Sequence, residues 1–345
     1  MGRTHFRRNL RRELEIRAKS TKYRPLFDEP DMTNTMNSRR YKLKIKASRH
    51  LSENDAKGAE KSLVKMLRRN PKDRYALSKI INLYTDGRRF EDGEKVIESA
   101  LKRKAADHGV YCSAITLYSM AGKLGKAYEL FESAVAGGSA DAVLCHRMLT
   151  VYTGIGFLEK AEMVFDTAVK NGFGSFLVYA IMTDFYYNRG MYEKTRETIV
   201  NAPPILKNSP RFMLMLLEVE RKLKNYEKAI IGADELIAKY PKKDFDDEFY
   251  VRARTIKAYC MMHSLGKEDA TGEFLILKNN VKRNSVHYPR ILCGYAFCGP
   301  ELTGREREQL SAELGLFLHG CRDSVRGKIE NAMRLLSIDA SQPNP

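Results

Sequence analysis

Apolar positions recur with helical spacing along most of the chain, and the pattern as a whole repeats. The clearest marker is a tyrosine that follows an apolar residue and returns every 34 positions. A glycine, a large apolar residue and several small residues occupy matching positions after each tyrosine. A period of this length predicts one structural unit repeated along the chain. The four tyrosines are Tyr84, Tyr118, Tyr152 and Tyr186.

Each copy has the pattern of a helical hairpin. We expect a first helix to end near the tyrosine, a glycine such as Gly122 to supply the turn, and a second helix to follow. Small residues on the second helix, such as Ala127 and Ala161, let the first helix approach closely. Each hairpin then buries its apolar face against its neighbours alone. The sequence therefore predicts an all-α fold, a right-handed α-solenoid of 34-residue helical hairpins.

The pattern is weaker on both sides of these copies but keeps its register. Ala59 and Leu63 upstream, and Tyr226 and Ala229 downstream, occupy the expected second-helix positions. The repeat is lost after about residue 280, where Thr303 opens a capping box and predicts a terminal helical hairpin. The predicted domains are a basic N-terminal arm at 1–50, a repeat solenoid at 51–280 and a C-terminal helical cap at 281–345.

The net charge adds a partner class to this picture. The chain has 60 Lys and Arg against 43 Asp and Glu, a formal charge of +17, which favours an anionic partner such as RNA. Residues 1–50 hold 15 of the basic and 5 of the acidic side chains. Pro25, Pro30 and the polar residues after them predict an extended basic arm. The expected phosphate contacts are Arg7, Arg8, Arg11, Arg12, Arg39, Arg40, Lys42, Lys44 and Lys46.

The first twelve residues carry five arginines and no acid, with apolar residues every four positions. This pattern is typical of a mitochondrial transit helix, and equally of a nucleic-acid-binding arm that the mature protein keeps. Both interpretations stay open. We predict a mitochondrial location, with a cytoplasmic one as the alternative. No apolar run approaches the length of roughly 20 residues that a membrane span needs.

The hairpin that contains Tyr118, Gly122 and Ala127 resembles both tetratricopeptide and pentatricopeptide repeats. In the junctions at 138–149 and 171–182 a glycine turn leads into the next helix, and a tyrosine such as Tyr179 opens that helix. These junctions favour the pentatricopeptide resemblance, which covers roughly residues 52–265.

In pentatricopeptide proteins, two residues of each repeat together read one base of single-stranded RNA. The first-position residues Cys112 and His146 depart from the usual pairs, and residues 106–202 hold 8 basic and 10 acidic side chains. The resemblance therefore implies a scaffold more than a sequence reader. The pairs that the resemblance implies are Ser78 with Asp107, Cys112 with Asp141, and His146 with Ser175.

Catalytic motifs are missing from the sequence. Nothing resembles a phosphate-binding loop, a nucleotide-binding glycine motif or a nucleophile elbow, and no acid–base pair stands out. The late cysteines and histidines, including Cys293, Cys298 and His319, lack the paired spacing of a zinc site. We therefore predict a non-enzyme with no metal, no cofactor and no small-molecule substrate.

The leading hypothesis is an RNA-associated scaffold whose basic arm contacts RNA phosphates while the solenoid contacts protein. The family resemblance implies a mitochondrial ribonucleoprotein such as the mitoribosome as its setting. One alternative is a tetratricopeptide-like adaptor that binds a peptide of a partner protein in its concave groove. A second alternative is a factor that binds single-stranded RNA in a sequence-specific manner through the repeats.

Overall fold

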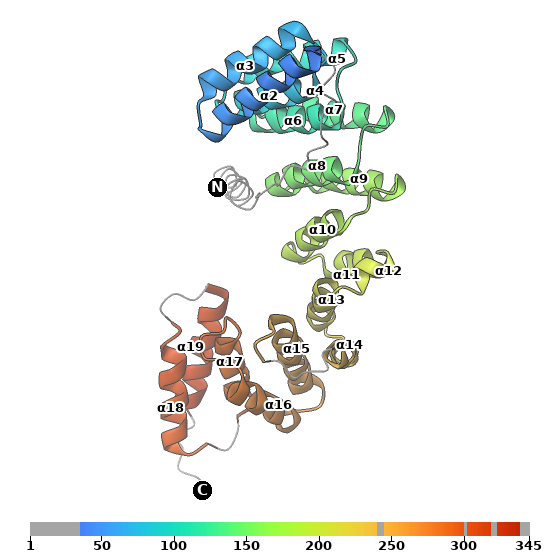
Figure 1. Cartoon of the computed structure of the whole chain (residues 1–345). Helices are drawn as coiled ribbons and strands as arrows, with labels where there is room; N and C mark the ends of the chain where they lie inside the picture. The colour runs from blue at the N-terminus through green and yellow to red at the C-terminus, as the bar shows by residue number, and fades with distance from the viewer. Residues whose placement is uncertain (1–34, 240–244, 300–301, 319–322, 339–345) are drawn as a thin grey trace. The chain divides into compact units, whose positions relative to one another are not determined.

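The computed structural model describes residues 35–239, 245–299, 302–318 and 323–338, and the regular elements among them are all helices. The chain forms two compact units, residues 1–182 and 183–345. Helix α10 (Phe176–Asn188) crosses from one to the other. Before it come α2 (Thr35–Ser52), α3 (Ala56–Arg69), α4 (Arg74–Asp86), α5 (Phe90–Lys102), α6 (His108–Met120), α7 (Leu124–Ala136), α8 (Ala142–Ile155) and α9 (Leu158–Lys170) (Figure 1).

In the second unit, the described residues after α10 form helices α11 to α19. They are α11 (Tyr192–Val200), α12 (Pro204–Lys207), α13 (Pro210–Lys222), α14 (Tyr226–Ala238), α15 (Glu248–Ser264), α16 (Lys267–Asn280), α17 (Tyr288–Cys298), α18 (Gly304–Gly315) and α19 (Asp323–Ile338).

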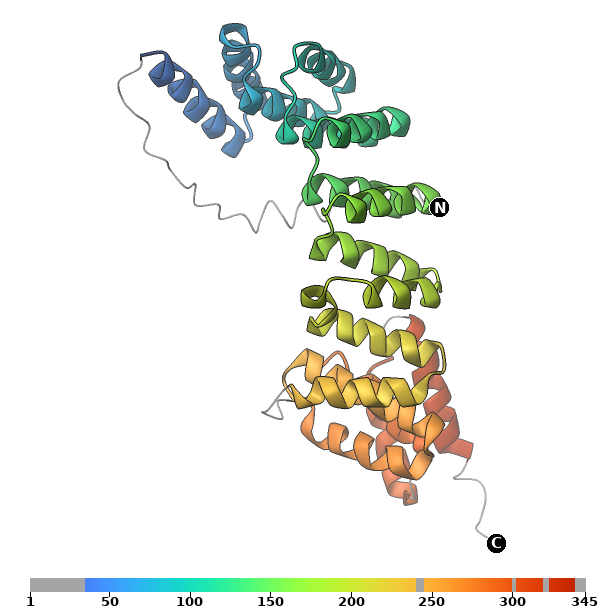
Figure 2. The same cartoon turned by 90° about the vertical axis from the view of Figure 1, so that its right-hand side faces the viewer.

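The helices begin with the predicted period. First helices α4, α6, α8, α10 and α13 start at residues 74, 108, 142, 176 and 210, and second helices α5, α7, α9, α11 and α14 start at 90, 124, 158, 192 and 226. Consecutive helices form antiparallel pairs (Figure 2). Within the first unit, α4 packs on α6 and α6 on α8. The prediction of an all-α array of 34-residue hairpins is confirmed.

The repeated tyrosines are core residues. Tyr84, Tyr118, Tyr152 and Tyr186 are all buried, and so are the small residues of the second helices. Gly93 shows why the second-helix position is small: a methyl group there would clash with a side-chain methyl carbon of Leu117 on the next first helix. The predicted close approach of neighbouring helices is therefore present.

The turn inside each hairpin depends on one left-handed residue. Gly122, Gly156 and Gly190 have φ angles of 78°, 80° and 74°. In the other copies a residue with a side chain adopts the same conformation, at Arg88 with φ 56° and Lys224 with φ 61°. Left-handed backbone costs a residue with a side chain roughly 1 to 2 kcal/mol, so the turns at Arg88 and Lys224 are less favourable than those with glycine.

The N-terminal boundary differs from the predicted one. Residues 35–50, assigned above to an extended arm, form most of helix α2, which packs on α3. Ala47 is fully buried in a cluster with Leu63, Met66 and Ile80, and Leu43 packs against this cluster. A narrow apolar stripe is enough to hold an otherwise polar helix when a neighbouring hairpin covers it.

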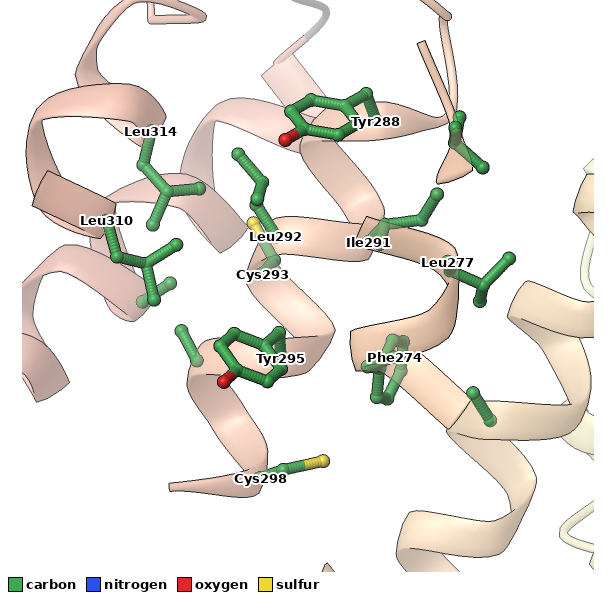
Figure 3. Packing of buried hydrophobic residues seen from close by; sticks show 14 of the residues in the cluster. Phe274, Leu277, Tyr288, Ile291, Leu292, Cys293, Tyr295, Cys298, Leu310 and Leu314 are labelled. Carbon is green, nitrogen blue, oxygen red and sulfur yellow. The ribbon is translucent and has the colours of Figure 1, made fainter. Parts of the chain in front are cut away.

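The C-terminal helices form one of the core clusters of the second unit. Figure 3 shows α17 at its centre, with Leu310 and Leu314 of α18 on one side and Phe274 and Leu277 of α16 on the other. The predicted capping box is present, since Thr303 accepts a hydrogen bond from the backbone N–H of Glu306 and the Glu306 carboxylate accepts one in return. Helix α19 then packs on both α17 and α18.

Candidate nucleic-acid interface

The predicted phosphate contacts fall into two groups. Arg7, Arg8, Arg11 and Arg12 lie outside the described residues. The other five are on helix α2, whose 18 residues hold six Lys and Arg and no acid. Within that group the structure exposes Arg39, Lys42 and Lys46 to solvent, while Lys44 and Arg40 also contact neighbouring side chains.

Two contacts fasten α2 to α4. The Arg40 guanidinium donates to the Asp73 carboxylate at 2.6 Å, and Asp73 is almost fully buried. Burial acts to raise the pKa of Asp73, but the Arg40 hydrogen bond and the backbone N–H of Ala76 outweigh it, and the pKa lies below its usual value. Ser48 and Tyr75 share a hydrogen bond of 2.8 Å. Arg40 therefore has a structural partner inside the protein.

The acids of the first hairpin are already engaged. Asp55 caps α3 through the Gly58 N–H at 2.9 Å and lies 2.8 Å from His50. Glu60 accepts hydrogen bonds from Arg89 at 2.7 Å and from Tyr84 at 2.9 Å, and the first of these is the main cause of its lowered pKa. With Asp73 bound to Arg40, three of the four acids in residues 35–73 are occupied.

The cations of the same hairpin outnumber these acids. Residues 35–73 hold 12 Lys and Arg against 4 Asp and Glu. Lys57, Lys61 and Lys65 recur every four residues along α3, so they share one exposed face with about 6 Å between successive residues. Eleven cations make no ion pair with any acid in the described part of the chain: Arg39, Lys42, Lys44, Lys46, Arg49, Lys57, Lys61, Lys65, Arg68, Arg69 and Lys72.

The second-position residues implied by the pentatricopeptide resemblance are helix caps. Asp107 accepts from the Val110 N–H at 3.1 Å, and Asp141 accepts from two backbone N–H groups at 2.9 Å. Ser175 lies at the same position before α10. Asp73 is in register with them, 34 residues before Asp107. An acid directly before a helical apolar pattern is an N-cap signal. Capping therefore explains why aspartate recurs at this position of the repeat, without any contact to a base.

The first-position residues have internal contacts as well. The Ser78 and Ser113 hydroxyls lie 2.8 Å apart. Cys112 is buried, with its Sγ 3.6 Å from a ring nitrogen of His108. His146 is half-buried on α8. Base reading by these residues stays a prediction. The structure indicates another candidate set, the unpaired lysines of α3. They were not among the residues predicted above, although their four-residue spacing is visible in the sequence.

The described residues hold five free cysteines, all buried, and burial raises the pKa of Cys145 to about 12. No three or more His, Cys, Asp and Glu side chains of the described ranges are grouped to hold a metal ion. His319 and Cys321, two of the late histidines and cysteines, lie outside those ranges. No helix in the described parts of the chain is both long and apolar enough to cross a bilayer.

Comparison with known proteins adds no family assignment by sequence. No family model matches the chain, and no curated protein matches it. Among solved structures, a tetratricopeptide repeat protein from Parabacteroides merdae is 16% identical, with 87% of this chain and 99% of that one covered and a TM-score of 0.43. The apo quorum sensor NprR from B. thuringiensis is 13% identical, with 89% and 94% covered and a TM-score of 0.45. The fold, an α-solenoid like those of tetratricopeptide and pentatricopeptide proteins, is established by the chain's own repeated hairpins.

Proposed function

We propose that the protein is a non-catalytic RNA-associated scaffold whose first hairpin, α2 with α3, binds the phosphate backbone. One observation carries the proposal: eleven exposed cations in residues 35–73 have no acidic partner, while three of the four acids in this segment are used within the fold. Lys and Arg side chains that neutralise phosphates supply most of the affinity of sequence-independent binding.

The helix caps support binding without sequence preference. Asp107 and Asp141 accept hydrogen bonds from backbone N–H groups, so these carboxylates already have partners within the protein. We therefore expect two unrelated RNAs to bind alike, and the other faces of the repeats to be available to protein partners.

The test is a triple substitution on α3. Lys57→Gln, Lys61→Gln and Lys65→Gln together should weaken binding of single-stranded RNA and lower the slope of log affinity against log salt by about 2, because roughly 0.7 counterions are released per phosphate contact. Fluorescence anisotropy of two unrelated labelled RNAs, titrated at about 50 and 200 mM salt, measures both quantities.

The matched control removes the same charge elsewhere. Lys170, Lys228 and Lys267 are exposed and have no ion-pair partner among the described residues. Their triple change to Gln should leave the salt slope nearly unchanged. Equal losses in the two triple variants would show that net charge alone matters, and an absence of RNA binding by the full chain would exclude the function.

The proposed setting is a mitochondrial ribonucleoprotein, on the basis of the arginine-rich first residues and the repeat resemblance. A fluorescent tag at the C-terminus should then colocalise with a mitochondrial marker. Uniform cytosolic fluorescence would contradict this setting and leave the RNA contact to be judged by the binding experiment.

A further inference from the structure

A second cationic surface lies in the unit of residues 183–345, on four helices that pack in series. Helix α13 packs on α15, α15 on α17, and α17 on α19. Lys328 of α19 holds its ammonium 5.5 Å from the ring centre of Tyr259 on α15. The Tyr259 hydroxyl donates to the backbone carbonyl of Arg290 on α17 at 2.8 Å. Lys328 and Arg290 are thus held near the same ring.

Positive charge prevails on this surface. Arg221 and Arg252 share one carboxylate, with Glu218 2.8 Å from the first and 3.9 Å from the second. No acid in the described ranges forms an ion pair with the other three cations, which are Lys222, Arg290 and Lys328. A further acid, Glu248, lies 3.7 Å from His287.

The electrostatics of Lys328 reflect this imbalance. Desolvation by the surrounding helices is the largest cause of its lowered pKa, and the positive charges of Arg221, Arg290 and Lys222 lower that pKa further. Although much of Lys328 faces solvent, its ammonium therefore stands in a positive environment. A bound oxyanion would relieve the repulsion among these cations.

The aromatic rings of the surface favour carboxylates over nucleotides. Proteins that bind single-stranded RNA present open rings on which bases stack. Here Lys328 lies over Tyr259, the Phe274 ring packs edge-on at 5.1 Å from it, and Lys222 lies 6.0 Å from the ring centre of Tyr192. Because these rings are already in contact with the protein's own side chains, they offer no free platform for a base.

We propose that Lys222, Arg290 and Lys328 form a binding surface for an acidic, extended segment of a partner protein. Their positions on α13, α17 and α19 spread the three cations along the packed helices, which suits successive carboxylates of one peptide. The site goes beyond the RNA contact, since it lies in the other unit and takes a different class of partner.

The experiment uses the full chain and a labelled peptide of alternating Glu and Ala, with the matched Gln–Ala peptide as the neutral probe. Wild type should bind the Glu peptide and not the Gln peptide. The double variant Arg290→Gln with Lys328→Gln should lose about tenfold or more in affinity for the Glu peptide, because two charge-assisted contacts are removed. Anisotropy titration measures each affinity.

Lys278→Gln is the matched control. Lys278 also lies over a tyrosine ring, 5.0 Å from the centre of Tyr295, but on α16, whereas the three cations lie on α13, α17 and α19. It should change the peptide affinity by less than about twofold. The double variant should melt no lower than wild type, because removing cations that repel one another does not weaken the fold.

Three results would overturn the site. The first is equal binding of the Glu and Gln peptides. The second is a loss of Glu-peptide affinity in Lys278→Gln as large as that in the double variant, and the third is an equally large loss in the α3 triple variant, which would place the peptide on the first hairpin. A loss of RNA affinity in the double variant without a loss of peptide affinity would assign the surface to RNA. Failure of this proposal is separable from failure of the RNA contact, because the α3 triple variant should lower the affinity for RNA and the double variant should lower the affinity for the Glu peptide.

Discussion

At the scale of single residues, Asp73 combines a helix cap with a buried ion pair. It caps α4 through the Ala76 N–H, and it binds Arg40 of α2 from a position that is 2% exposed. Asp141 caps α8 with a half-exposed side chain. This position of the repeat therefore supplies a helix cap at both Asp73 and Asp141, but a buried ion pair only at Asp73.

Asp73→Ala should lower the free energy of unfolding by about 2 to 3 kcal/mol, since it removes the cap and leaves Arg40 without its partner. Asp141→Ala should cost about 1 kcal/mol, the value of the cap, because the contact of Asp141 with His108 is half-exposed and adds little. The Asp73 pKa is lowered in the folded state, so its contribution is present above the ordinary value of 3.8 and is lost as the pH falls below it. Urea titrations at neutral and acidic pH measure these effects, and equal losses from the two variants would show that the ion pair adds nothing.

At the scale of the hairpin, the left-handed turn is the feature that every repeat shares. The backbone angle is conserved between copies even where the residue is not glycine, as at Arg88 and Lys224. The packing of the two helices against each other fixes this angle, and the residue at the turn then accepts it. Glycine makes the conformation inexpensive.

Substitutions at the turn should therefore have opposite signs. Arg88→Gly should raise the free energy of unfolding by about 0.5 to 1 kcal/mol, and Gly122→Ala should lower it by about 1 kcal/mol. A methyl group at Gly122 meets no atom within 4 Å, so the loss arises from the backbone and not from a clash. Thermal melting compares the two variants, and destabilisation by Arg88→Gly would contradict this interpretation.

At the scale of the whole molecule, positive charge is concentrated in two places. One is the hairpin of α2 and α3 in the first unit, and the other is the surface with Lys222, Arg290 and Lys328 in the second unit. Helix α2 belongs to that hairpin and not to an extended arm. This placement makes two truncations of similar length behave differently.

Removal of residues 1–34 should preserve the melting temperature and retain part of the RNA affinity, because α2 and α3 remain. Removal of residues 1–50 should lower the melting temperature by several degrees, since it uncovers the apolar face that Ala47 and Leu43 occupy. Differential scanning calorimetry of the two truncated chains checks this, and equal melting temperatures would show that α2 does not stabilise the hairpin.

The sequence by itself determined the period, the helices and the turns of this protein. Helical apolar spacing and turn residues are local signals, so the 34-residue register and the capping box at Thr303 followed from them. Only the tertiary structure decided which charges are free. Asp73 is 33 residues from Arg40, and Lys328 is 69 from the Tyr259 that it covers, so no local pattern reveals either contact. Neutralisation of a charge depends on where other helices place its partner. The spacing of the α3 lysines is therefore present in the sequence, but their lack of acidic partners is decided by the packing of the hairpins.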